Sequence, residues 1–443
     1  MPVSRAPIRD GAVGVSADRI AYVGPRDAAP PATETIDLGE AYLLPGLVNA
    51  HTHLELTVMR GYLEAASFRD WLWRLTQARV QVLDDATLGA SARLGIAEGL
   101  LAGITTYADT SSTPAAMHAM LQMGVRGISY QEVFGPDPAQ SASAIAELGD
   151  RLRRLTPHAS AIVALGISPH APYTVSDTLY DHVAKLREIT GLPVAAHIAE
   201  SRAEVDFVVR ATGPFAESWR TRGFPVRQRA SSPIALLEER GILAAQALLI
   251  HCVQVDDADI ARIAASGASV VHCPASNAKL GHGVAPLARL LAAQIPVGLG
   301  TDSVASNNRM DLLDDARLAS LVAASQNGGP ALSANRVLEL ATLGGAYCLG
   351  LHGEIGSLDA GKSADMTAFR VDPLRDEPVY DPVTSLVFGG GGRRAIMVCV
   401  AGAELVRDGR LVASLDEDTA TARNAGQRLA QFVADAAPRS YAD

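Results

Sequence analysis

Cysteine is scarce in this chain. Its 443 residues include four cysteines, which are widely scattered and form no Cys-x-x-Cys pair. That spacing argues against a disulfide framework and against a structural zinc ribbon. We therefore expect Cys252, Cys273, Cys348 and Cys399 to be buried, reduced thiols.

Long apolar runs and basic runs are absent as well. No stretch approaches the roughly 18 uninterrupted apolar residues that a membrane helix needs, and the start, Met-Pro-Val-Ser-Arg, lacks the apolar region of a signal peptide. The formal net charge is −10, and Lys and Arg form no run that could neutralise nucleic-acid phosphates. We expect a cytoplasmic protein that acts on a small molecule and binds neither membranes nor nucleic acids.

The chain has ample material for a large core. Hydrophobic residues make up 48% of it, and 443 residues exceed the usual size of a single core. Between residues 45 and 353, short apolar runs alternate with amphipathic stretches such as 86–102 and 141–155. Repeated strand-then-helix units imply a parallel sheet, and eight of them match a closed (β/α)₈ barrel. The predicted strands are the one ending at His51 and the segments 104–107, 127–130, 162–167, 194–198, 248–251, 269–272 and 297–299.

The two ends of the chain carry short strand-like segments separated by turn residues. Each end is too small to bury a core, so the two most simply pair with one another. We expect residues 1–44 and 354–418 to form one composite β-sandwich domain beside a barrel of residues 45–353, followed by a C-terminal helix and tail at 419–443. The predicted segments are strands at 11–16, 19–23, 35–37, 364–370 and 395–405, a turn at 407–410 and a helix at 419–432.

Ligand-type side chains follow several of the predicted barrel strands. His51 and His53 are two residues apart, so in an extended strand both imidazoles point to the same side. His197, His251 and Asp302 stand at or just beyond the ends of later apolar runs. Strand ends converge on one face of a parallel barrel, and imidazole with carboxylate suits zinc, iron or manganese better than calcium.

The ordinary interpretation of one histidine at a strand end is a buried structural residue. Five ligand-type residues in the same register favour a metal site over coincidence. Other histidines of the chain keep the ordinary interpretation, namely His118, His158, His182, His282 and His352.

The whole chain resembles the amidohydrolase superfamily, in the branch that holds adenosine-type deaminases, S-adenosylhomocysteine deaminases and triazine chlorohydrolases. Each motif alone is modest evidence, but their order along the chain is specific. The motifs are residues 45–53 (Pro-Gly-Leu-Val-Asn-Ala-His-Thr-His), 166–173 (Gly-Ile-Ser-Pro-His-Ala-Pro-Tyr), 197–200 (His-Ile-Ala-Glu), 272–277 (His-Cys-Pro-Ala-Ser-Asn), 300–303 (Gly-Thr-Asp-Ser) and 356–366.

The resemblance implies a ligand set for one divalent cation per chain, most simply Zn²⁺, with Fe²⁺ or Mn²⁺ as alternatives. Two-metal members of the superfamily carry a bridging lysine at the end of the fourth strand, where this chain has Ile-Ser-Pro-His and no lysine. His170 at that point is then expected to contact the heterocycle of the substrate. The implied ligands are His51, His53, His197 and Asp302.

Three residues are expected to carry the proton transfers. Asp302 would accept a proton from the water that attacks the substrate, and His251 would aim that water. Glu200, which would ordinarily be interpreted as a surface residue, follows His197 where the strand has just ended. It is our choice for the group that protonates a ring nitrogen, a role that typically contributes about 10²–10⁴-fold.

The substrate is predicted less directly. The homocysteine-nucleoside deaminases typically carry an acidic residue after a Trp-Leu pair, whereas this chain continues from Trp71-Leu72 without one. The sequence His-Thr-His-Leu-Glu resembles deaminases of 6-aminodeoxyfutalosine, an adenine nucleoside with an aryl carboxylate arm. Glu55 would then hold sugar hydroxyls. An arginine would pair with the arm, the candidates being Arg60, Arg69, Arg74 and Arg79, each of which can equally be a solvated helix residue.

Alternatives remain open at this point. The enzyme could deaminate S-adenosylhomocysteine, 5′-methylthioadenosine or adenosine, or act as a triazine-type chlorohydrolase or aminohydrolase. A non-catalytic scaffold with the same fold is a more remote alternative, because it would be expected to have lost ligands. A homodimer is possible.

Overall fold

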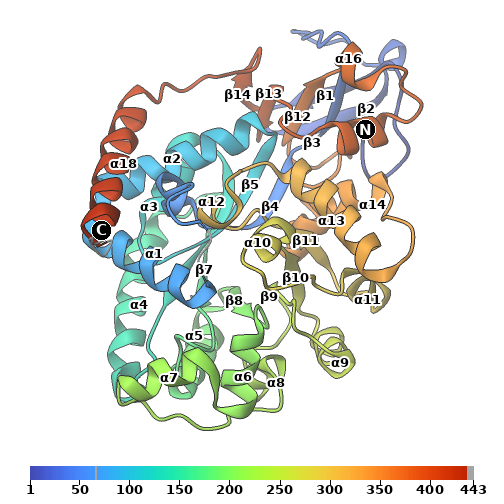
Figure 1. The fold of residues 1–443 in the computed structure, drawn as a ribbon. Helices are drawn as coiled ribbons and strands as arrows, with labels where there is room; N and C mark the ends of the chain where they lie inside the picture. The colour runs from blue at the N-terminus through green and yellow to red at the C-terminus, as the bar shows by residue number, and fades with distance from the viewer. Residues whose placement is uncertain (65–66, 437–443) are drawn as a thin grey trace, which may run out of the picture.

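The computed structural model describes residues 1–64 and 67–436, and its centre is a parallel β-barrel surrounded by helices (Figure 1). Eight strands lie in sequence order around the barrel, from β4 to β11. The ring is closed where Thr52 bridges to Asp302 and the Asp302 N–H donates to the His51 carbonyl at 3.0 Å. The predicted (β/α)₈ barrel is confirmed. Its strands are β4 (Leu47–Thr52), β5 (Ile104–Ser111), β6 (Arg126–Val133), β7 (Val163–Pro169), β8 (Val194–Ile198), β9 (Ala247–His251), β10 (Ser269–His272) and β11 (Val297–Leu299).

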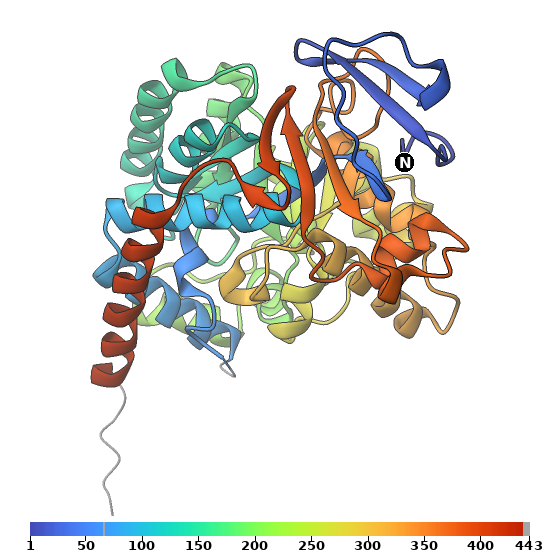
Figure 2. The ribbon, with the colours of Figure 1, turned by 90° about the horizontal axis from the view of Figure 1, so that it is seen from above.

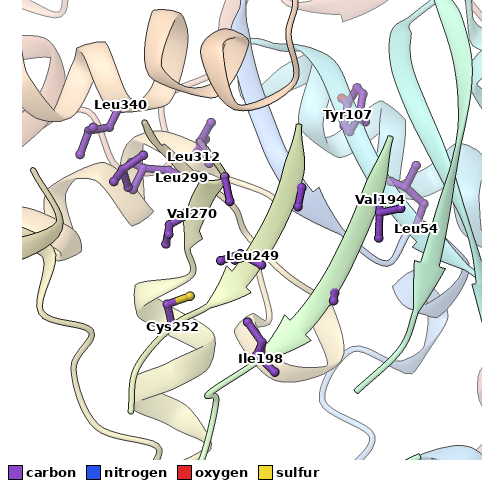
Figure 3. Close-up of a cluster of buried hydrophobic side chains, with 14 of the residues drawn as sticks. Leu54, Tyr107, Val194, Ile198, Leu249, Cys252, Val270, Leu299, Leu312 and Leu340 are labelled. Carbon is purple, nitrogen blue, oxygen red and sulfur yellow. The ribbon is translucent and has the colours of Figure 1, made fainter. Parts of the chain in front are cut away.

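Alternation along the strands separates two apolar layers. Leu248 and Ile250 of β9 point into the barrel interior, whereas Leu249 between them joins the layer that packs under the helices. Figure 3 shows part of that outer layer, with Val194, Leu249, Val270 and Leu299 on neighbouring strands. Strands that are apolar on both faces are typical of parallel sheets.

The helices begin at capping side chains that the sequence supplies. Ser67, Asp84, Ser176 and Ser201 each accept a hydrogen bond from a backbone N–H of the first turn that follows. No helix within the described ranges is long and apolar enough to cross a membrane. The helices are α1 (Phe68–Val82), α2 (Asp85–Leu101), α3 (Ala115–Met123), α4 (Ser141–Leu155), α5 (Asp177–Thr190), α6 (Arg202–Arg210), α7 (Gly213–Thr221), α8 (Pro233–Glu239), α9 (Asp257–Ser266), α10 (Pro274–Lys279), α11 (Leu287–Ala292), α12 (Val304–Asn307), α13 (Leu312–Asn327), α14 (Ala334–Glu339), α15 (Gly345–Cys348), α16 (Pro373–Asp376), α17 (Pro382–Gly389) and α18 (Asp416–Ala436).

The two ends of the chain meet in antiparallel sheets beside the barrel (Figure 2). Strand β3 from the N-terminal part pairs with β12, inside a five-stranded sheet of order β15-β14-β13-β12-β3. A separate hairpin, β1 with β2, is linked to the C-terminal part by the bond from the Ile20 N–H to the Lys362 carbonyl, at 2.8 Å. The strands are β1 (Gly11–Ser16), β2 (Arg19–Pro25), β3 (Ala41–Pro45), β12 (Met366–Arg370), β13 (Ala395–Val400), β14 (Ala403–Arg407) and β15 (Arg410–Leu411).

Some local expectations for these ends are wrong. The segment 395–405 is a hairpin instead of one strand, because Ala401 and Gly402 adopt φ of 47° and 78° and turn the chain between β13 and β14. Residues 35–37 form no strand. Helix α18 starts at Asp416, and the predicted tail at 437–443 lies outside the described residues. The division between barrel and sandwich domains stays a prediction.

A buried ion pair ties the barrel to the segment that leads into β12. Arg126 of β6 donates from Nε to Asp365 Oδ2 at 2.7 Å and from Nη2 to Asp365 Oδ1 at 3.1 Å. Both side chains are almost fully buried, with 7% and 1% of their surface exposed. Asp365 Oδ1 also accepts from the Ala401 N–H at 2.8 Å.

Asp365→Ala is expected to destabilise the protein by about 3–5 kcal/mol, because it leaves the Arg126 guanidinium buried without a counter-charge. Chemical denaturation monitored by circular dichroism measures this change. Glu354→Ala, which breaks the exposed pair with Arg19, is the control and should change stability little. Equal shifts for the two variants would contradict a structural role for the buried pair.

Candidate metal centre and active site

The four implied ligands meet at the carboxyl ends of the barrel strands. Asp302 Oδ1 lies 3.1 Å from His51 Nε2 and 3.5 Å from His53 Nε2. His53 Nε2 lies 3.3 Å from His197 Nε2. The fifth predicted residue, His251, has its ring centroid 5.6 Å from that of His197.

Local backbone features bring these side chains together. The apolar run 43–48 is divided at Gly46. The residues before Gly46 belong to β3 of the five-stranded sheet, and the residues after it belong to β4 of the barrel. Just after β11, a side chain on Gly300 would place its Cβ 2.9 Å from the Cβ of His51, so only glycine allows this approach. His251 and Asp302 adopt positive φ of 80° and 57°, which is uncommon for residues other than glycine and clusters at functional sites.

The donor set fits a divalent cation. Ligand atoms placed tetrahedrally at about 2.0–2.1 Å from a zinc ion stand about 3.3–3.4 Å apart, close to the three separations above. The His197 Nδ1–H donates to the His170 carbonyl oxygen at 3.1 Å, which leaves the Nε2 lone pair facing His53. Two overlapping groups in this cluster have the spacing of metal ligands, His51 with His53 and Asp302, and His51 with His197 and His251.

The charge states favour cation binding. Burial and the neighbouring His51 lower the pKa of His53 to about 3. Burial, with the adjacent histidines, also lowers the pKa of His197 well below its usual value. Burial alone would raise the pKa of Asp302, but the hydrogen bond with His51 and the nearby imidazoles lower it well below the usual range. Neutral imidazoles and an ionised carboxylate are the forms that bind metals.

Asp302 and His251 are held by neighbouring polar groups. Asp302 Oδ2 accepts from the hydroxyls of Ser276 at 2.5 Å and Ser306 at 3.2 Å. His251 Nδ1 lies 2.9 Å from Asn277 Oδ1, an acceptor, so Nδ1 carries the proton and Nε2 is free to face the site. Two residues of the motif 272–277 therefore hold predicted site residues in place: Ser276 bonds Asp302, and Asn277 bonds His251.

Glu200 is buried beside this cluster. Its Oε1 lies 3.5 Å from His251 Nε2 and 3.1 Å from His282 Nε2, and Tyr173 donates its hydroxyl to Oε2 at 3.3 Å. Glu204 fixes the backbone here by accepting from the Glu200 N–H at 2.9 Å. Burial works to raise the pKa of Glu200, but the two imidazoles outweigh it and the net shift is downward.

A cavity of about 770 Å³ opens over these groups. Its polar end contains His53, His197, Glu200, His251 and Asp302, together with His170. Its outer part is largely aromatic and apolar, with Phe68, Trp71, Leu72, Trp73, Phe215 and Trp219. The volume lies within the usual range for small-molecule sites, so the cavity is large enough for a small organic substrate next to the candidate metal centre.

Comparison with known proteins identifies the family. The model of the amidohydrolase family matches residues 42–405 of the chain. This chain belongs to the amidohydrolase family. It is 34% identical over 430 residues to a 5-methylthioadenosine/S-adenosylhomocysteine deaminase of Desulforudis audaxviator, an alignment that covers 96% of each protein. The amidohydrolase is therefore a hydrolase that acts on C–N bonds.

Solved structures of similar proteins share the fold across nearly the whole chain. An adenosine deaminase from Xanthomonas campestris with bound zinc aligns with a TM-score of 0.86 at 28% identity, covering 97% of each chain. The atrazine chlorohydrolase of Arthrobacter aurescens, also with zinc, gives 0.81 at 26% identity, covering 95% of this chain and 96% of that one. An aminofutalosine deaminase from Helicobacter pylori gives 0.79 at 19% identity, covering 90% and 96%, and shows the common fold alone.

Glu55 lies on the cavity wall of the amidohydrolase, but with its carboxyl oxygens engaged. Strand β4 ends at Thr52 and a 3₁₀ helix begins at Leu54, so Glu55 lies in that helix beyond the strand. Arg79 donates from Nη2 to Glu55 Oε2 at 2.7 Å, and the Thr113 hydroxyl donates to Oε1.

The structure separates the candidate arginines. Arg69 and Arg79 line the cavity, joined by Arg222, which sequence reasoning missed. Arg60 pairs with Glu98 instead. Arg74 does not line the cavity in the part of the chain that the structure describes.

Two further site residues were not predicted. His282 lies in a loop after α10, so no strand end marked it, yet it approaches Glu200. Glu132 lies near the end of β6 on the cavity wall, so the signal that marked His197 could also have marked this residue. Burial raises the pKa of Glu132 to about 8, against the opposing effect of Arg79.

Proposed function

We propose that this amidohydrolase hydrolytically deaminates an aminated purine nucleoside and releases ammonia. The observation that carries the proposal is the position of Glu200. Its buried carboxyl group lies between His251 and His282 on the wall of a cavity that also contains the metal-type donor set. A proton carrier beside a hydrolytic centre is what attack on a ring carbon next to a ring nitrogen requires.

The proposed ligands are His51, His53, His197 and Asp302, holding one divalent cation that is most simply Zn²⁺, with Fe²⁺ or Mn²⁺ as alternatives. The zinc in the structures of similar proteins supports this choice. When bound, such a cation lowers the pKa of water from about 15.7 towards 7.

The protein's own residues would move two protons. Glu200, ionised at rest, takes one proton from the attacking water and gives it to the ring nitrogen as the C–O bond forms. Asp302 takes the second proton and gives it to the amino group, which leaves as ammonia when the C–N bond breaks. His251 orients the water through Nε2. His170 contacts the heterocycle.

The substrate that we propose within this class is 6-aminodeoxyfutalosine. An aromatic outer cavity and three lining arginines, Arg69, Arg79 and Arg222, would suit a large 5′ arm that ends in a carboxylate. S-adenosylhomocysteine or 5′-methylthioadenosine is the second candidate, supported by the name of the relative that aligns over 96% of the chain. The homodimer and the cytoplasmic location stay predictions.

A substrate panel tests the proposal. Purified enzyme is incubated with 6-aminodeoxyfutalosine, S-adenosylhomocysteine, 5′-methylthioadenosine, adenosine, free adenine and an aminotriazine, and released ammonia is measured. At least one nucleoside should react, with kcat/KM at least about 10-fold above that of adenine, because the sugar adds hydrogen bonds. Faster reaction of the triazine than of every nucleoside would favour a triazine hydrolase instead.

A further inference from the structure

Glu132 lies at the mouth of the barrel and has no role in the reaction proposed above. Ile128 and Tyr130 of β6 lie in the apolar cluster inside the barrel, and Glu132, two residues further, points to the same side. That position places its carboxyl group on the cavity wall, with 7% of the residue exposed.

The carboxyl group of Glu132 is incompletely satisfied. Its Oε1 is buried and has no hydrogen-bond partner among the residues that the structure describes. Glu55, the other acidic residue at this part of the wall, accepts from Arg79 and Thr113 through its two oxygens. Buried polar atoms without hydrogen-bond partners are rare. Glu132 is therefore a better candidate than Glu55 for a carboxyl group that forms its missing hydrogen bond with a bound ligand.

Glu132 lies close to His170, the residue that we expect to contact the heterocycle of the substrate. Potential ligand atoms of Glu132, His170 and His197 all lie within 4.8 Å of one another. Thr174 donates its hydroxyl to the Ala171 carbonyl at 3.1 Å and lies 2.8 Å from His170 Nδ1, so Nδ1–H is the donor and Nε2 is left as an acceptor. A substrate ring against His170 would bring its attached sugar close to Glu132.

A second cation fits this group poorly. The Nδ1 atom of His197 binds the His170 carbonyl, and its Nε2 already faces His53. Two ligands would remain, His170 and Glu132, fewer than the three protein ligands of a catalytic zinc site.

We propose that Glu132 binds the sugar hydroxyls of the nucleoside, and that Glu55 instead holds Arg79 in position on the cavity wall. This inference rests on the proposed function. A carboxyl group can accept hydrogen bonds from two neighbouring hydroxyls, and the loss of two such hydrogen bonds in a buried site typically costs about tenfold in affinity.

The test compares adenosine with 2′,3′-dideoxyadenosine, which lacks both hydroxyls. The kcat/KM ratio of the two nucleosides is measured for the wild type, Glu132→Ala, Glu132→Gln and Glu55→Ala, with metal content determined for each. We expect Glu132→Ala to lower the ratio at least about 10-fold, mainly through a lower kcat/KM for adenosine, and to leave the metal content nearly unchanged. Glu132→Gln keeps the shape and one acceptor, and should lower the ratio at least about 3-fold. Glu55→Ala should leave the ratio unchanged.

An unchanged ratio in both Glu132 variants, or a ratio that falls in Glu55→Ala instead, would overturn the assignment. If Glu132→Ala does not fold, the Gln variant decides. Failure of the wild type to deaminate any nucleoside would refute the proposed function itself, and the assignment of Glu132 with it.

Discussion

His197→Ala is expected to lose both the bound divalent cation and the release of ammonia. The imidazole lies 3.3 Å from His53, and its tautomer is set by the His170 carbonyl, so the variant removes a preorganised donor. Removing even an indirect support of a metal ligand costs about 10–100-fold, so kcat/KM should fall by at least about 10²-fold. Elemental analysis and an ammonia assay measure the two effects.

The matched control for this variant is His118→Ala on α3. His118 is an exposed histidine outside the cavity, and its loss should leave metal content and activity intact. Full metal occupancy in His197→Ala would show that His197 is not a ligand.

Glu200→Gln is expected to lower kcat by at least about 10²-fold while metal content stays normal. The amide keeps the shape of the side chain beside His251 and His282 but cannot carry a proton between water and the ring nitrogen. Steady-state kinetics with elemental analysis of the same sample measures the effect.

The comparison variant is Glu217→Gln, on the exposed side of α7, which should behave as the wild type does. Loss of metal from Glu200→Gln would mean that Glu200 is a ligand or a folding residue. An unchanged kcat would remove it from the reaction.

The barrel could be predicted because each of its strands is a short apolar run and the strands follow one another in sequence order around the sheet. Segments 194–198, 269–272 and 297–299 coincide with β8, β10 and β11. The hairpin at Ala401 and Gly402 was missed, because apolar residues on both sides read as one continuous strand. A turn of positive φ leaves little trace when one of its two residues is alanine.

The candidate site could be predicted where it follows strand ends. His197 and Asp302 were found this way, because their strands point at a common mouth. His282 was missed because a loop carries it to Glu200, and such long-range placement has no local pattern. The contact of Glu55 with Arg79 was also beyond sequence reasoning, because it depends on the 3₁₀ helix that follows His53.

The dependence of the reaction on metal is tested by a metal titration of the chelated enzyme, following ammonia release from the best nucleoside of the panel. We expect no activity without metal and a linear rise with added Zn²⁺ that saturates at one equivalent per chain. Full activity after exhaustive chelation, or saturation only at two tightly bound equivalents, would contradict it.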